Sequence, residues 1–147
     1  MKIKVINLSK TNKLPEYKTS GSAGMDILAN LDNPVTINPG KRACIGSGLK
    51  MAIPEGYEIQ IRPRSGLALR EGLTVLNTPG TIDSDYRDEI GVILINQGEE
   101  PVVIEPGERI AQLVLNRIEK AELIEIDDFS EIDKQNDRGG GYGHTGK

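Results

Sequence analysis

Residues 57–62 read YEIQIR, and this short stretch indicates the fold class of the whole chain. In an extended strand, Tyr57, Ile59 and Ile61 share one face, whereas the polar residues that alternate with them share the other. This period of two is typical of a half-buried strand. Comparable apolar runs recur along the chain at 2–8, 35–37, 42–46, 49–53, 73–76, 89–96, 101–104 and 109–118.

Turn signals separate these runs, which predicts short strands and few helices. The signals are NPG at 38–40, PEG at 54–56, PG at 79–80 and PGE at 106–108. Only 65–72, SGLALREG, is predicted to be helical, with Ser65 as the N-cap and Gly72 as the stop. Aromatic residues are 3% of the chain, so the core must be aliphatic and β-branched. We expect an all-β sandwich, barrel or jelly roll with one short helix.

Size, cysteine content and charge limit the classes of function. A chain of 147 residues suits one domain, and Cys44 is the sole cysteine, so we expect no disulfide and a cytoplasmic location. The amino terminus lacks a secretion signal, and no apolar run can span a bilayer, so no membrane partner is expected. The net charge is −4 with scattered basic residues, which argues against nucleic acid as a partner.

The stretch 80–89, GTIDSDYRDE, places four carboxylates between two apolar runs. One interpretation is a solvated hairpin tip. The other is functional: in strand geometry Asp83 and Asp85 point the same way, and Tyr86 follows at once. An aspartate beside an aromatic ring is a plausible general base near a planar ligand.

Two further segments carry candidate anion contacts. Arg64 and Ser65 begin the predicted helix, where free N–H groups attract anions. A serine at this position is equally expected if it only caps the helix. Arg109 and Gln112 could bind an anion through a guanidinium group and an amide. The alternative is that they are ordinary polar residues at the start of a strand.

The last ten residues, RGGGYGHTGK, contain five glycines and predict a flexible tail. This tail could close over a phosphorylated ligand as a lid, or it could be an end without a role. Its candidate contacts are Arg138, Tyr142, His144 and Thr145. His144 is the only histidine, so a histidine-based metal site is set aside, and neither a dinucleotide motif nor a P-loop occurs.

Five segments in order resemble the five motifs of the trimeric dUTP diphosphatase (dUTPase) family, and they extend over nearly the whole chain. They are SAGMDI at 22–27, PRSGLA at 63–68, GTIDSDYRDE at 80–89, GERIAQLV at 107–114 and RGGGYGHTG at 138–146. The resemblance implies a jelly-roll β-barrel domain at 1–136, a flexible lid at 137–147, and a homotrimer with active sites at subunit interfaces. It also implies Mg²⁺-assisted hydrolysis of dUTP to dUMP and pyrophosphate, which keeps uracil out of DNA and supplies dUMP for thymidylate synthesis.

The same resemblance implies roles for the third motif and the hairpin before it. Asp83 matches the aspartate that activates the attacking water, and Tyr86 matches the tyrosine that packs on the deoxyribose. Asn77 matches the asparagine that reads uracil, helped by backbone groups around Gly80 and Ile82.

The other motifs imply contacts to the phosphates, the metal and the base. Ser65 and Gln112 resemble phosphate contacts, with Arg64 and Gly66 shaping the former, and Asp26 resembles the aspartate near Mg²⁺, acting through water. The tail residues resemble those that close over a neighbour's site, where Tyr142 would stack on uracil. The chain departs from the family pattern by one residue fewer after Arg138, by Asp88 in place of glycine, and by Met25 in place of tyrosine or leucine.

Two alternative functions remain open at this point. A dCTP deaminase, or a bifunctional deaminase and diphosphatase, shares the barrel, but 76–86 and the final motif follow the dUTPase pattern. A regulator that binds dUTP without turnover would have no need of a base at Asp83.

Overall fold

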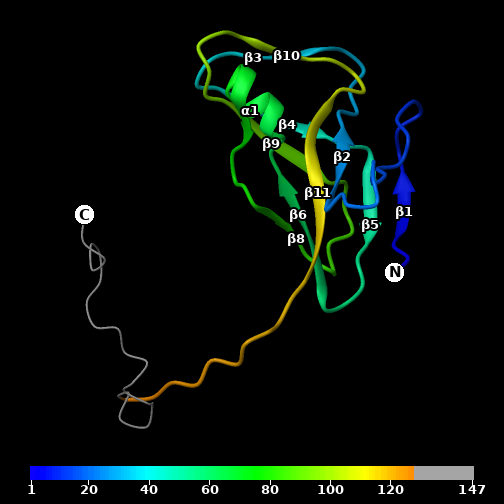
Figure 1. Cartoon of the computed structure of the whole chain (residues 1–147), viewed down its shortest axis with the longest axis vertical. Helices are drawn as coiled ribbons and strands as arrows, with labels where there is room; N and C mark the ends of the chain where they lie inside the picture. The colour runs from blue at the N-terminus through cyan, green and yellow to red at the C-terminus, as the bar shows by residue number, and fades with distance from the viewer. Residues whose placement is uncertain (128–147) are drawn as a thin grey trace.

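Strands account for most of the regular structure in residues 1–127, the part of the chain that the computed structural model describes (Figure 1). In this part, one helix, α1 Ser65–Glu71, lies between β6 and β7. The strands are β1 Lys4–Asn7, β2 Gly24–Leu28, β3 Val35–Ile37, β4 Arg42–Gly46, β5 Leu49–Ala52, β6 Tyr57–Arg62, β7 Leu73–Val75, β8 Gly80–Ile82, β9 Gly91–Asn96, β10 Val102–Ile104 and β11 Arg109–Arg117.

Two antiparallel sheets enclose the core. The larger has the order β2-β11-β6-β8 and the smaller β4-β9-β7, and the two-stranded ladders β1-β5 and β3-β10 flank them (Figure 1). Ile59 and Ile61 of β6 belong to the same buried aliphatic cluster as Val92 of β9. The isoleucines of the alternating stretch YEIQIR therefore face this core, as predicted. The all-β jelly-roll fold is confirmed, with one short helix within residues 1–127.

Two strands escaped the sequence analysis, and one interpretation was wrong. β2 and β8 both begin with glycine, and β2 carries a charged residue, so neither stands out as a strand. β7 pairs with β9, but β8 pairs with β6 in the other sheet. Residues 76–90 therefore leave the smaller sheet after β7, add β8 to the larger sheet, and return to the smaller sheet at β9. They are not a simple hairpin tip. Strand geometry ends at Ile82, because the Tyr86 amide donates to the Asp83 carbonyl in a turn.

The helix α1 ends where the sequence predicts but is capped differently. Arg64, not Ser65, is the N-cap, and no side chain accepts a hydrogen bond in the cap. The predicted cap was wrong by one residue, so Ser65 is the first helical residue and its hydroxyl is not used as a cap. Gly72 ends the helix with φ 65° and donates its N–H to the Ala68 carbonyl.

Replacing Gly72 by alanine is expected to destabilise the fold more than the same change at Gly40. Both glycines have positive φ, so each alanine costs about 1–3 kcal/mol in backbone strain. A Cβ at Gly72 would also lie 2.7 Å from the Gly98 Cα, whereas a Cβ at Gly40 would have no atom within 4 Å. Overpacking against backbone raises the expected loss for Gly72→Ala to about 2–6 kcal/mol. Denaturant midpoints of the two variants check this; equal losses would contradict it.

The chain after β11 leaves the body as an extended arm, 118–127, as Figure 1 shows in orange. Leu123 is 93% exposed and Ile124 is 77% exposed. These two neighbouring apolar side chains are therefore open to solvent in the single chain, within an arm that is otherwise rich in charged residues. Within residues 1–127, no helix has the length and apolar character needed to cross a membrane.

Candidate active site

The central strand β11 brings polar residues from three strands into one row. Gln112 is paired with Asp26 of β2 on one side and with Arg62 of β6 on the other. Residues directly opposite each other in a sheet point to the same face. This row therefore lies on the face opposite to the aliphatic core, which Ile61 and Leu113 enter from the other side.

Asp26 is the electrostatic centre of this face. Its Oδ1 accepts a hydrogen bond of 3.0 Å from Arg64 Nε, and its Oδ2 lies 3.5 Å from a terminal nitrogen of Arg109. Arg64 also donates to the Arg109 carbonyl at 3.1 Å. The carboxylate is 22% exposed, so one half-buried anion holds two guanidinium groups in place. We call Asp26, Arg64, Arg109 and Gln112 the Asp26 cluster.

Gln112 is fixed by its neighbours. Its Nε2 donates to the Pro63 carbonyl at 3.0 Å, which joins β11 to the residues that lead into α1. Gly24 makes room for this amide, because a Cβ at Gly24 would collide with Gln112 Oε1. Ser65 is exposed and Gly66 is half-buried in the first turn of α1, directly after Arg64. The structure thus brings the predicted residues of the first, second and fourth motifs together.

A second group of residues surrounds β8 and the turn that follows it. Asn77 is exposed and its amide packs on Gly80, where a Cβ would lie 3.1 Å from the Asn77 Nδ2. Ile82 is half-buried opposite Ile59. The absence of a side chain at Gly80 therefore permits the close approach of the Asn77 amide.

The turn at 83–86, which we call the Asp83 turn, is exposed to solvent. Asp83 is exposed, and Tyr86 is 39% exposed with its hydroxyl donating to the Glu89 carbonyl at 2.9 Å. Arg87 closes the turn, because its guanidinium donates to the Ser84 and Tyr86 carbonyls at 2.6 and 2.9 Å. The carboxylate and the ring are thus both accessible to a ligand.

The Asp26 cluster and the Asp83 turn lie toward opposite ends of β6. Ile82, just before Asp83, is opposite Ile59, whereas the cluster adjoins Arg62. Three residues of strand separate these two rows by about 10 Å. A single chain therefore does not bring Asp83 beside Arg64 and Gln112.

Asp26 is the residue whose fit to a metal ion the described part of the chain allows us to assess. Among residues 1–127, no three His, Cys, Asp or Glu side chains gather into a potential metal site. The Asp26 oxygens already face Arg64 and Arg109. Mg²⁺ prefers oxygen ligands and retains several waters, so this single carboxylate fits contact through water rather than an all-protein site.

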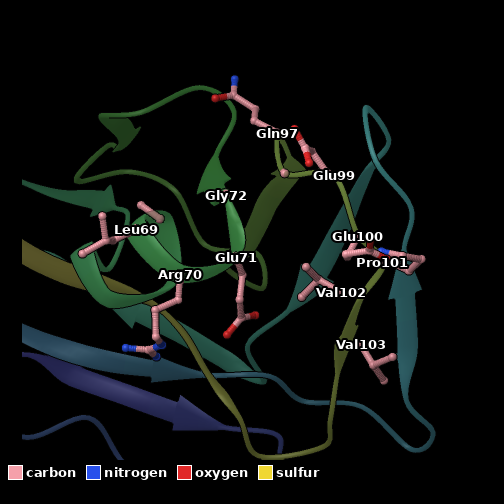
Figure 2. Close-up of a pocket in the computed structure, with 12 residues that line it drawn as sticks. Leu69, Arg70, Glu71, Gly72, Gln97, Glu99, Glu100, Pro101, Val102 and Val103 are labelled. Atoms are coloured by element: carbon pink, nitrogen blue, oxygen red, sulfur yellow. The ribbon is translucent and has the colours of Figure 1, made fainter.

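A groove of about 640 Å³ lies elsewhere. Figure 2 shows its two walls, one formed by α1 with Leu69, Arg70 and Glu71 and the other by the segment from Gln97 to Val103. None of the predicted site residues lines it. Its size therefore does not make it the active site.

Some residues of interest lie outside these expectations or outside the described part. Arg138, Tyr142, His144 and Thr145 fall in 128–147, beyond the described residues. Glu89 was not among the residues expected to act, and its carboxylate accepts a hydrogen bond from the Gly48 amide at 2.7 Å. No sequence signal indicates that contact, because 41 residues separate the partners.

The fold and these two groups define a jelly-roll protein that carries a cluster of guanidinium, amide and carboxylate groups and, apart from it, a carboxylate turn beside an exposed ring. The dUTPase family model matches residues 10–146. A deoxyuridine 5'-triphosphate nucleotidohydrolase of Fusobacterium nucleatum is 54% identical over 135 residues, covering 92% of this chain and 90% of that protein. The chain belongs to the dUTPase family.

Solved structures agree with this assignment. A mutant dUTPase of Staphylococcus bacteriophage 80alpha, solved with dUpNHpp, superposes with a TM-score of 0.82 at 26% identity over 99% of both chains. A mutant dUTPase of phage phi11 of S. aureus, which coordinates a structural Mg(II) ion, has a TM-score of 0.79 at 24% identity. The match covers 88% of this chain and 99% of the phage protein, and it supports the fold alone.

Proposed function

We propose that this protein hydrolyses dUTP to dUMP and pyrophosphate by attack of water on the α-phosphorus. The observation that carries the proposal is the family match over 10–146, which spans all five motif segments. The Asp26 cluster adds a physical reason, since fixed guanidinium and amide groups suit a triphosphate.

Asp83 is the proposed general base. Its exposed carboxylate takes a proton from water as the new oxygen–phosphorus bond forms, and the bond from the α-phosphorus to the bridging oxygen breaks. Pyrophosphate leaves with the electron pair of that bond. General-base help of this kind contributes about 10²–10⁴-fold to the rate.

The phosphates are the proposed ligand of the Asp26 cluster and the start of α1. Gln112 and the Ser65 hydroxyl donate to phosphate oxygens, while Arg64 holds the local geometry through its bond to Asp26. Mg²⁺ is the proposed cofactor; bound mainly to the triphosphate, it relieves negative charge in the transition state. Asp26 would contact it through water.

Tyr86 and Asn77 are the proposed specificity residues. The Tyr86 ring packs on the deoxyribose and leaves no space for a 2′-hydroxyl, while Asn77 and the backbone around Gly80 and Ile82 bind the uracil edge. A site built to hydrogen-bond one base leaves buried groups unpaired with another, which costs on the order of 10⁴-fold. The methyl group of thymine would meet the backbone at Gly80.

The proposed assembly is a homotrimer with each site shared between subunits. The distance of about 10 Å along β6 between the rows of Ile82 and Arg62 supports it, because Asp83 does not lie beside Arg64 and Gln112 within one chain. The arm 118–127 supports it too, since a neighbouring subunit would cover the exposed side chains of Leu123 and Ile124. The remaining contacts, from Arg138, Tyr142, His144 and Thr145, are proposed to come from a neighbour's lid at 137–147.

Pyrophosphate release from dUTP and from the four common dNTPs, each with Mg²⁺, tests the function. We expect turnover of dUTP and rates lower by about 10⁴-fold for dCTP. No ammonia should be released from dCTP. Ammonia would identify a deaminase, and dUTP binding without pyrophosphate release would identify a regulator.

A further inference from the structure

We propose that Glu89 is a positioning residue that sets how strongly the enzyme prefers deoxyribose to ribose. This inference rests on the proposed function, in which Tyr86 excludes the 2′-hydroxyl. It assigns to Glu89 the task of holding Tyr86 in place.

The Asp83 turn is held internally by local bonds, which do not fix it to the barrel. The Tyr86 amide donates to the Asp83 carbonyl, and Arg87 donates to the Ser84 and Tyr86 carbonyls. All of these contacts join residues at most three apart. They close the turn, while its two ends are anchored to the barrel by Ile82 at the end of β8 and by Ile90, whose amide donates to the Leu49 carbonyl at 2.9 Å and whose carbonyl accepts the Ser47 amide at 3.1 Å.

Between these two anchors, Glu89 adds a side-chain connection to the barrel. Its Oε1 accepts the Gly48 amide at 2.7 Å, and its backbone carbonyl accepts the Tyr86 hydroxyl at 2.9 Å. The same residue thus binds the ring on one side and the turn between β4 and β5 on the other. A hydrogen bond to a carboxylate is stronger than one between neutral groups.

The turn between β4 and β5 is itself fixed by backbone hydrogen bonds to other parts of the barrel. The Gly48 carbonyl accepts the Leu8 amide at 2.7 Å, and the Gly46 carbonyl accepts the Asn30 amide at 2.8 Å. The Glu89 carboxylate lies directly over Gly46, where a Cβ would come 2.6 Å from Oε1. The absence of a side chain at Gly46 therefore makes room for Glu89.

The neighbouring carboxylate does not share this role. Asp88 is 86% exposed and its only ion pair in the described part, with Lys50, spans 3.8 Å. An exposed pair of this length contributes little. Asp88→Gly is therefore a matched control one residue away.

The first measurement is the ratio of kcat/KM for dUTP to that for UTP. We expect Glu89→Ala to lower this ratio by about 10- to 100-fold, because a small displacement of Tyr86 opens space for the 2′-hydroxyl. Glu89→Gln keeps the acceptor oxygen and should retain most of the ratio. Gly46→Ala, which displaces the Glu89 carboxylate from the other side, should lower it as Glu89→Ala does. Asp88→Gly should leave it unchanged.

The second measurement, hydrogen exchange of the amides at 83–90, does not require activity. Exchange should be faster in Glu89→Ala and Gly46→Ala and unchanged in Asp88→Gly. An unchanged dUTP to UTP ratio, or unchanged exchange in both folded variants, would overturn the proposal. Failure of the wild-type protein to release pyrophosphate would remove the proposed function instead, and hydrogen exchange alone would then decide whether Glu89 holds the turn.

Discussion

Asp83→Asn is expected to lower kcat for dUTP by about 10²–10⁴-fold while dUTP still binds. Asparagine has nearly the same shape as aspartate but cannot accept the proton of the attacking water. The exposed carboxylate of Asp83 has no hydrogen-bond partner in the described part of the chain, so the change should not disturb the fold. Single-turnover rates with saturating dUTP measure the loss, and calorimetric titration measures the binding.

Asp85→Asn is the matched control for this variant. Asp85 is exposed in the same turn, two residues further along, and carries the same charge. It has no proposed contact with dUTP, so its removal should change kcat little. A similar loss in both variants would indicate that the negative charge of the turn matters rather than a base at Asp83. Full activity of Asp83→Asn would remove Asp83 from the base role.

Deletion of residues 137–147 is expected to lower kcat/KM for dUTP by about 10²-fold or more and to leave the assembly folded. The proposed lid supplies Arg138 to the phosphates and Tyr142 to the uracil ring. Without it, water also reaches the reacting centre. Steady-state kinetics measure the loss, and light scattering checks the assembly. An unchanged rate would mean that the shorter final motif of this chain has no catalytic function.

Point variants separate the two parts of this effect. Arg138→Ala should reproduce part of the loss if the arginine reaches the phosphates despite the shorter spacing after it. Tyr142→Phe keeps the stacking ring and should stay close to the wild type.

Mixed assemblies of the two impaired chains test whether sites are shared between subunits. The Asp83→Asn chain keeps the tail, and the truncated chain keeps Asp83. When both are co-expressed with different tags, some interfaces should combine an intact Asp83 with an intact tail, so activity should exceed that of either variant alone. Activity equal to the sum of the two variants would place each complete site within one chain.

The local sequence determined the strands whose pattern is complete within a few residues. YEIQIR and RACIG form β6 and β4 with the bounds that their sequences predict, because alternation in the first and a short apolar run between turn signals in the second are properties of neighbouring residues. Gly72 ends α1 for an equally local reason, since it alone of the nearby residues adopts positive φ without strain. The order of the five motif segments likewise indicated the family that the comparisons confirm.

Only the tertiary structure decided the contacts between distant segments. β2 and β8 are strands because β11 and β6 pair with them, not because their own residues favour strands. Arg64 reaches Asp26 across 38 residues and Glu89 reaches Gly48 across 41. The register of pairing sets such contacts, and register depends on how two sheets share one aliphatic core. For the same reason, the sequence identified Asp83 and Gln112 as candidate site residues but did not show that they lie toward opposite ends of β6 in one chain.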